Sequence, residues 1–405
     1  MIRQRQSVLQ LDDQDALERA VELMTIPGPP GKESEVQEYI VRVLRRAAVP
    51  ESWIRVDDCH RRSPFGGETG NLIVTLPGTA KGPRRLLMAH LDTVPICVGA
   101  QPVLRGHYVR NLNSASGLGA DNRSGTATIL TALIEIMRRE LPHPPLTFLW
   151  CVQEEVGLYG SRYVDVSLLQ KPTMGFNWDG DLPQRVTIGA IGARRYTAVI
   201  QGVASHAGVA PERGVNALVV ASLAISELHR RGWHGAVRKR DGQGTANIGI
   251  VAGGNATNVV MPELRIEGEV RSHDRAFQKK MIAAYKEAFN RAAQAVSNVD
   301  GKRARVKFKD HESYRPFRLR EDSPVVTIAE EAVRAIGLEP ERYVANGGLD
   351  ANSMALHRIP TVTFGAGQRD VHTTRESMHI PSFLRACRLA LYLAVDGRIQ
   401  ERTSS

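Results

Sequence analysis

The sequence predicts an α/β protein in which a small α+β domain interrupts a larger one. Short apolar runs alternate with helical patterns before residue 192 and again after residue 309, an order typical of a sheet covered by helices on both faces. Between these two parts the pattern runs β-α-β-β-α-β, which is ferredoxin-like. We therefore expect a larger domain of residues 1–191 and 310–405, and an inserted domain of residues 192–309.

The first part of the larger domain begins with a helical pattern. Ser34 to Gln37 fit a capping box, and apolar residues then recur at helical spacing up to Ala47. Four apolar runs are expected to be strands: 71–76, 85–89, 146–152 and 173–177. Between the second and third runs, a helix carries Leu130, Leu133, Ile134 and Met137 on one face.

The inserted segment supplies four more strand-like runs and two helices. The runs are 195–201, 246–251, 264–270 and 303–309. One helix is expected over 215–230, and the other has an apolar face of Phe277, Met281, Ala284, Tyr285, Ala288 and Phe289. The α/β character then returns with a helix near 324–336, a strand over 361–364 and a last helix from Pro381.

The composition is that of a globular protein. Of the 405 residues, 42% are hydrophobic and 24% are charged, which excludes wholesale disorder and fibrous repeats. No stretch approaches the roughly 20 apolar residues of a membrane helix. Residues 1–6 lead into Asp12 and Asp13 rather than into an apolar run. We therefore expect neither a membrane span nor a signal peptide.

The four cysteines are widely spaced, at Cys59, Cys97, Cys151 and Cys387. This spacing argues against a disulfide framework and against a thiolate zinc site. We expect a cytoplasmic protein.

The positive charge is concentrated in one segment. The whole chain carries +10, whereas residues 194–309 carry 20 basic and 9 acidic side chains, a net +11. A solvated basic face explains this surplus, and so would attraction of anionic substrates or of nucleic acid. Because the basic residues lack interleaved aromatic residues, nucleic acid is not an expected partner.

Two candidate ligands follow the second predicted strand, in the region where open α/β sheets place their active sites. In His90-Leu-Asp92, residues i and i+2 of extended chain point to the same side, so Asp92 could orient a metal-binding His90. A hydrogen-bonded loop histidine is the alternative. Asp121, in Gly119-Ala-Asp121, stands at a helix entry and could equally be an N-cap.

Carboxylates also follow the next two strands. Glu154 and Glu155 repel each other and need a cation or a proton, so one could ligate a metal while the other takes a proton from water. A solvated acidic loop is the alternative. Asp179 precedes Gly180 and could form a turn, and His372 could be a surface histidine.

In combination, these residues show a family pattern. The chain resembles the peptidase T / carboxypeptidase G / aminoacylase superfamily of dinuclear zinc hydrolases, and its last three matching stretches resemble the peptidase T branch. The stretches span nearly the whole chain: His90-Leu-Asp-Thr-Val-Pro95, Gly119-Ala-Asp121 with Gly125, Glu154-Glu-Val-Gly-Leu-Tyr-Gly-Ser161, Asp179-Gly180, Ser205-His-Ala-Gly208 with Pro211 and Asn216, Gly253-Gly-Asn-Ala-Thr-Asn-Val-Val260, Gly347-Gly-Leu-Asp-Ala-Asn352 and His372-Thr-Thr-Arg-Glu376.

The resemblance implies a zinc-exopeptidase-type three-layer catalytic domain that holds two divalent metal ions. Asp121 would bridge the metals. His90 and Asp179 would complete one site, and Glu155 and His372 would complete the other. Nitrogen and oxygen ligands without a thiolate suit zinc, and also cobalt or manganese.

The resemblance also assigns supporting roles. Glu154 would be the general base for a metal-bridging water, and Asp92 would orient His90. A cis peptide is implied at Asp121-Asn122, where most relatives have a second acidic residue in place of Asn122. With Asp121, Glu154, Glu155 and Asp179 together carrying −4, two divalent ions would balance the charge.

By the same resemblance, the inserted domain is a lid that forms a homodimer. His206 would reach the partner's active site and stabilise the oxyanion. Asn258 and Arg271 would bind the carboxylate or carbonyl of the substrate. Because Arg271 lies in the basic segment, we expect small anionic peptides to be favoured.

We therefore expect a dinuclear metal-dependent exopeptidase that hydrolyses short peptides, as a tripeptidase-like aminopeptidase does. The alternatives are a carboxypeptidase or an N-acyl or N-carbamoyl amino-acid amidohydrolase on the same scaffold. A non-catalytic metal- or polyanion-binding protein is the alternative from another class.

Overall fold

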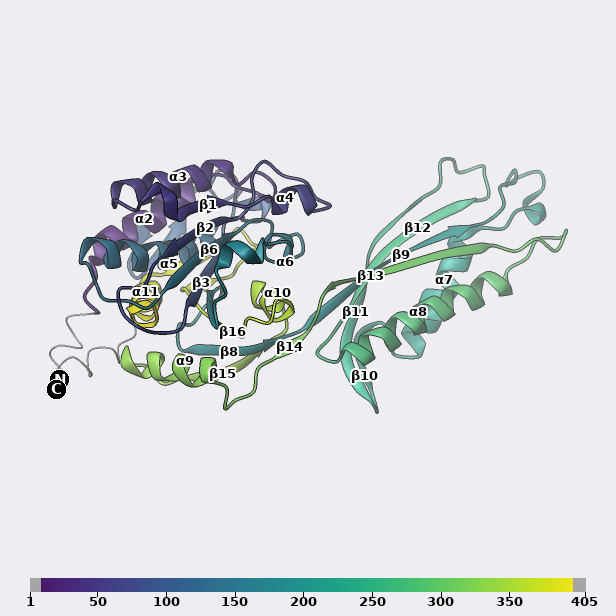
Figure 1. The fold of residues 1–405 in the computed structure, drawn as a ribbon. Coiled ribbons are helices and arrows are strands. Elements are labelled where there is room, and N and C mark those ends of the chain that lie inside the picture. The colour runs from purple at the N-terminus through teal and green to yellow at the C-terminus, as the bar shows by residue number, and fades with distance from the viewer. Residues whose placement is uncertain (1–8, 396–405) are drawn as a thin grey trace. The chain divides into compact units, whose positions relative to one another are not determined.

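The computed structural model describes residues 9–395 and divides the chain into two compact units (Figure 1). The first unit comprises Met1–Ala190 and Arg318–Ser405, and the second comprises Ile191–Phe317. The predicted boundary after residue 309 is therefore too early, because β13 (Arg305–Tyr314) continues beyond it. Residues 1–6, which we expect to contain no signal peptide, lie outside the described residues.

A nine-stranded sheet lies at the centre of the first unit. Its order is β1-β2-β6-β3-β7-β16-β8-β14, with β15 beside β8. The neighbours β6, β3, β7 and β16 are parallel, so their carboxyl ends share one edge. The strands are β1 (Ile54–Val56), β2 (Leu72–Leu76), β3 (Arg85–His90), β6 (Leu146–Cys151), β7 (Met174–Trp178), β8 (Arg185–Ala190), β14 (Phe317–Arg318), β15 (Glu341–Ala345) and β16 (Thr361–Phe364).

Apolar side chains on both faces of this sheet are buried under helices, which gives three layers (Figure 1). In β3, Leu87 and Ala89 enter one core, while Leu86 and Met88 enter the other. The helices are α2 (Asp13–Thr25), α3 (Ser34–Arg46), α4 (Cys59–Arg62), α5 (Ala120–Arg138), α6 (Tyr159–Arg162), α9 (Pro324–Ala335), α10 (Asp350–Leu356) and α11 (Ile380–Val395). The predicted α/β class is therefore confirmed.

A smaller, four-stranded sheet also belongs to the first unit and was not predicted. Its order is β17-β18-β5-β4. The strands are β4 (Pro102–Arg105), β5 (Tyr108–Asn111), β17 (Gln368–Arg369) and β18 (Ser377–His379). It joins two segments that are more than 250 residues apart in the sequence.

The second unit contains one five-stranded sheet, of order β10-β11-β12-β9-β13, with α7 and α8 packed against it. Its elements are β9 (Gly192–Gln201), α7 (Ala217–Arg230), β10 (Gly235–Lys239), β11 (Gly242–Gly253), β12 (Glu263–Ser272), α8 (Arg275–Ala295) and β13. The predicted order lacks β10, which forms a hairpin with β11. The turn dipeptide Asp241-Gly242 was the available signal.

The start of α3 differs from the prediction. Ser34 is the first residue of the helix, and the N-cap Glu33 makes no side-chain capping bond. The Ser34 hydroxyl donates instead to Glu68 Oε2, at 2.6 Å. The capping-box interpretation was therefore wrong, although the helix itself is present.

Within residues 9–395, none of the helices combines the length and apolar character that a membrane span requires. The four cysteines are buried and free, as their spacing predicted.

Gly125 allows α5 to lie directly against the end of β7. A Cβ at this position would lie 2.2 Å from Asn122 Oδ1 and 2.3 Å from the Trp178 carbonyl oxygen, and both distances are too short for any larger residue. This close approach brings the start of α5, which carries Asp121, beside the residues that follow β7.

Candidate metal centre

The predicted ligands of the first unit lie at the shared carboxyl edge of the parallel strands. His90 ends β3, Glu154 and Glu155 follow β6, Asp179 follows β7, His372 lies beyond β16, and Asp121 stands in the first turn of α5. Strand order and direction therefore bring together residues that span 282 positions of the sequence.

Asp121 lies between two imidazoles. Its Oδ1 atom is 3.3 Å from His90 Nε2, and its Oδ2 atom is 3.2 Å from His372 Nε2. His372 Nε2 also lies 3.0 Å from Glu155 Oε1. Ligand atoms of His90, Asp121 and Glu155 lie within 4.8 Å of one another. This geometry lets one carboxylate face two positions, as a bridging ligand must.

The residues present fit divalent metal ions. Asp121 Oδ1 is buried but accepts no hydrogen bond, so it has a lone pair directed into the cluster. The donors are imidazole nitrogens and carboxylate oxygens, which suit zinc and related ions. The Asp121-Asn122 peptide bond is cis, as the resemblance implies.

The side-chain amide of Asn122 is not available as a metal ligand beside Asp121, because both of its polar atoms form hydrogen bonds within the protein. Its nitrogen donates to the Trp178 carbonyl oxygen at 2.7 Å, and its oxygen accepts from Gly125 N–H at 3.1 Å and from Gln368 at 2.8 Å.

Burial makes this concentration of acidic groups unfavourable without a cation. It raises the pKa of Glu154 and of Asp179 well above the usual range; in each case His90 opposes the rise, and neighbouring carboxylates add to it. Burial also raises the pKa of Glu155, against a hydrogen bond from His372. Asp121 is the exception. Although burial opposes its ionisation, the adjacent imidazoles of His372 and His90 hold its pKa well below the usual range.

The same carboxylates raise the pKa values of the two imidazoles. Asp121 and Glu155 raise the pKa of His372 to about 10. Burial disfavours the charged form of His90, but Asp121 and Asp92 outweigh it and raise the pKa well above its ordinary value. These shifts favour the protonated form of both rings, and a metal ion must displace those protons to bind the ring nitrogens.

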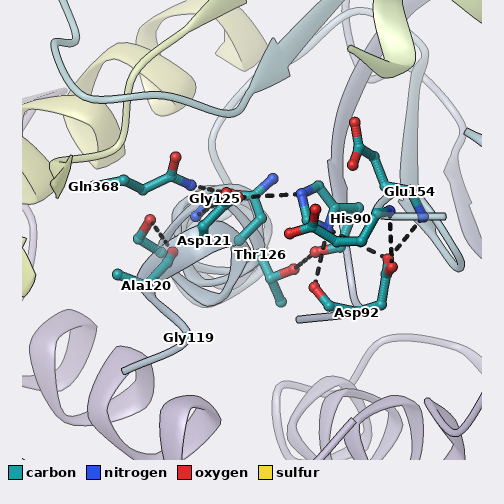
Figure 2. A network of polar contacts seen from close by, with 12 residues as sticks. His90, Asp92, Gly119, Ala120, Asp121, Gly125, Thr126, Glu154 and Gln368 are labelled. Atoms are coloured by element: carbon teal, nitrogen blue, oxygen red, sulfur yellow. Dashed lines mark hydrogen bonds and ion pairs between the residues drawn. The ribbon is translucent and has the colours of Figure 1, made fainter. Parts of the chain in front are cut away.

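Asp92 supports more than His90 (Figure 2). Its carboxylate accepts the backbone N–H groups of Glu154 at 2.9 Å and Glu155 at 3.0 Å. His90 Nδ1 lies 3.0 Å from the Asp92 carbonyl oxygen and 3.4 Å from Oδ1. Asp92 is fully buried and thus fixes the backbone of the adjacent glutamates as well as the imidazole. The sequence pattern indicated only its relation to His90.

Glu376 holds the loop that carries Asp121, a role that was not predicted from the sequence. Its carboxylate accepts the backbone N–H groups of Leu118, Gly119 and Asp121 at 2.7–2.9 Å. Since Glu376 lies four residues after His372, it ties the His372 loop to the loop that carries Asp121. Its only signal in the sequence was its place at the end of the family stretch His372-Thr-Thr-Arg-Glu376.

The remaining predicted residues lie in the second unit. His206 and Asn258 are on adjacent segments, because His206 forms a β-bridge with Val259, and Ala207 N–H donates to the Asn258 carbonyl oxygen at 2.9 Å. Arg271 is on β12, where its Nε donates to Glu269 at 2.7 Å.

A known protein family matches most of the chain. The model of peptidase family M20/M25/M40 matches residues 86–396. The chain belongs to this family. It is therefore a hydrolase of the metallopeptidase type, and it is a peptidase T-like member.

Relatives of this M20 protein match over nearly its whole length. The uncharacterized protein YqjE of Bacillus subtilis is 31% identical over 94% of this chain and 98% of its own. A tripeptidase from Staphylococcus aureus has a TM-score of 0.84 and 29% identity, covering 95% of this chain and 98% of its own. The aminopeptidase PepT from Bacillus cereus has a TM-score of 0.81 and 28% identity, covering 95% and 99%.

We predict that Glu376→Gln weakens the metal centre. A glutamine amide must turn its NH₂ group towards at least one of the three N–H donors, and an unsatisfied buried donor typically costs about 1–3 kcal/mol. We expect the free energy of unfolding of the metal-free variant to fall by about that amount, and metal affinity to fall too. Urea denaturation and metal titration measure both, with the exposed Glu38→Gln as the control. Unchanged values would show that Glu376 does not hold these loops.

We also predict that metal binding releases protons. The pKa values of His372 and His90 are raised in the metal-free protein, which favours the protonated rings, and metal binds only neutral imidazole. Affinity should therefore increase from pH 6 to pH 8. Calorimetry in buffers of different ionisation enthalpy measures the released protons, and His229→Gln on α7 should leave their number unchanged. Binding without proton release would contradict the assignment of these ligands.

Proposed function

We propose that this M20 protein is a dinuclear metal-dependent exopeptidase that releases the N-terminal residue of short peptides. The observation that carries the proposal is Asp121, whose two carboxylate oxygens face His90 and His372 separately. The tripeptidase and the PepT aminopeptidase, at 29% and 28% identity over 95% of this chain, support an aminopeptidase.

Five side chains would hold the two metals. Asp121 would bridge them, His90 and Asp179 would complete one site, and Glu155 and His372 would complete the other. When bound, two such ions lower the pKa of water and polarise the scissile carbonyl. We propose zinc, with cobalt or manganese as alternatives, because the donors are nitrogen and oxygen.

Glu154 is the proposed general base. Its carboxylate forms no hydrogen bond with any described residue, unlike that of Glu155, which contacts His372. The carboxylate is therefore free to accept the proton of the attacking water and to pass it to the leaving amine. Asp92 fixes the Glu154 backbone and so directs this side chain.

The second unit is proposed to form a homodimer. Leu218, Val219 and Leu223 on α7 are each close to half exposed, as are Ile250 and Val251 on β11. Among the described residues, the outer part of β11 beyond Ala246 pairs only with β12, so one strand edge is open. An exposed apolar helix face beside an open edge is a surface suited to a second copy of the chain.

In this dimer, His206 is proposed to stabilise the oxyanion in the partner's active site. Its side chain is exposed, and among the residues that the structure describes its Nδ1 accepts a hydrogen bond only from the nearby Gly208 N–H. Asn258 and Arg271 are proposed to bind the substrate carbonyl or carboxylate. The terminal nitrogens of Arg271 are free of bonds to described residues, which leaves its fork available for a carboxylate. Because all four cysteines are free, we also propose a cytoplasmic location.

We predict that Glu154→Gln keeps both metals but loses about 10²–10⁴-fold in turnover, because the general base is removed. Wild type, Glu154→Gln and the control Glu38→Gln would be assayed on tripeptides and on N-acyl amino acids. Metal content and products would be measured. We expect wild type to release a free N-terminal amino acid from tripeptides. Cleavage of blocked amino acids alone would instead indicate an amidohydrolase, and normal turnover by Glu154→Gln would exclude this base.

We further predict that two inactive chains complement each other. Mixing His206→Ala with Glu154→Gln chains produces heterodimers in which one active site has both residues, so part of the activity should return. Turnover is measured after confirmed subunit exchange, with each variant alone as the control. Confirmed heterodimers without activity would mean that His206 does not act across the interface.

A further inference from the structure

The small sheet of the first unit gathers positive side chains on one face. Arg369 pairs with Ser377 and Ser377 with Arg110, while Arg105 pairs with Tyr108 and Tyr108 with His379. Directly paired residues, and residues two apart in a strand, project to the same side. Ser377 and Val103 therefore share one face with four positive or ionisable side chains and Tyr108. We call the group of Arg105, Tyr108, Arg110, Arg369 and His379 the cationic face.

The side chains of the cationic face contact one another around Tyr108. The guanidinium carbons of Arg110 and Arg369 lie 5.0 and 5.6 Å from the centroid of its ring, within the range of cation–π contacts. The His379 ring lies 5.1 Å from the same centroid. Two guanidinium groups are thus gathered at one aromatic ring, within about 11 Å of each other.

The positive charge of this face is not balanced by the protein. Within residues 9–395, Arg105, Arg110 and Arg369 form no ion pair, whereas Arg342 and Arg388 of the same unit pair with carboxylates. His379 is likewise surrounded by basic side chains. Burial, followed by Arg369, His107 and Arg385, lowers the pKa of His379. An anion bound here would gain charge-assisted hydrogen bonds without displacing an internal partner.

Arg369 connects the cationic face to the metal centre. It lines a cavity of about 640 Å³ together with Asp121 and Asp179, and it lies only three residues before His372. Extended chain spans at most about 3.3–3.6 Å per residue, so a tripeptide spans about 10 Å. By the same rule, the Cα atoms of Arg369 and His372 are at most about 11 Å apart, so a short peptide whose first peptide bond lies at the metals is long enough to reach Arg369.

We propose that the cationic face binds a carboxylate of the peptide substrate and makes the enzyme prefer short acidic peptides. The planar guanidinium fork matches the geometry of a carboxylate. The carboxylate is supplied either by the C-terminus of the peptide or by an acidic side chain. This inference rests on the proposed peptidase function, but it concerns residues outside the metal ligands and outside the basic second unit.

The test compares matched peptides in the double variant Arg110→Gln/Arg369→Gln. Ala-Ala-Glu is paired with Ala-Ala-Gln, and Ala-Ala-Ala with its C-terminal amide. We expect the ratio of kcat/KM for the carboxylate over the neutral peptide to fall about tenfold in one of these pairs, mainly through KM. That pair identifies the source of the carboxylate. The control is Arg42→Gln, which removes another exposed arginine, 5.5 Å from the Tyr39 ring on α3. Ratios equal to those of the control in both pairs would overturn the proposal.

A binding experiment separates this proposal from the proposed function. Calorimetric titration of Ala-Ala-Glu into Glu154→Gln protein measures affinity without turnover, and adding Arg369→Glu should weaken that affinity. Binding of Ala-Ala-Lys should become stronger if an acidic side chain is the source of the carboxylate, and weaker if the C-terminus is the source. If wild type cleaves no peptide but Arg369→Glu weakens binding of Ala-Ala-Glu and changes that of Ala-Ala-Lys, the peptidase proposal fails and the cationic face stands. If wild type cleaves peptides but Arg369→Glu leaves both affinities unchanged, the cationic face is refuted.

Discussion

Repulsion among buried carboxylates is the constraint on which the first unit depends. Asp121, Glu154, Glu155 and Asp179 share one edge of the sheet, and burial disfavours every negative charge added there. Cations and hydrogen-bond donors are the two means of stabilising such a cluster. The protein supplies two imidazoles and directs backbone amides towards Asp92. Divalent cations would balance the negative charge that remains. We therefore expect folding and metal binding to be coupled in this unit.

Much of the fold could be predicted, because long buried elements have a clear periodicity. The strand 361–364 was predicted with its observed bounds, and the helix that carries Leu130 was also found. The four-stranded sheet was missed, because its strands have two to four residues and pair across segments that are distant in sequence. The prediction of a capping box failed for a related reason, since the Ser34 hydroxyl donates a hydrogen bond to the distant Glu68 instead of capping its own helix.

The candidate site was predictable as a set rather than residue by residue. His90, Asp121 and Asp179 each had an ordinary structural explanation, and only their order along the chain favoured a metal site. The hydrogen bonds that hold the ligand-bearing loops in place could not be predicted in the same way. Glu376 and Asp92 act by accepting backbone N–H groups from segments tens to hundreds of residues away, and sequence shows the acceptor but not which donors meet it.

The position of the second unit within the chain determines when the first unit can be completed during synthesis. β7 ends at Trp178 and its neighbour β16 begins at Thr361, so residues 179–360 are translated between them. At roughly 5–20 residues per second, this interval lasts about 10–40 s. By the end of this interval His90, Asp92, Asp121, Glu154, Glu155 and Asp179 have been synthesised, but His372 and Glu376 have not. Each nascent chain thus passes through a stage in which the central strand β7 is open on the edge that later pairs with β16, the kind of surface that chaperones cover on the ribosome.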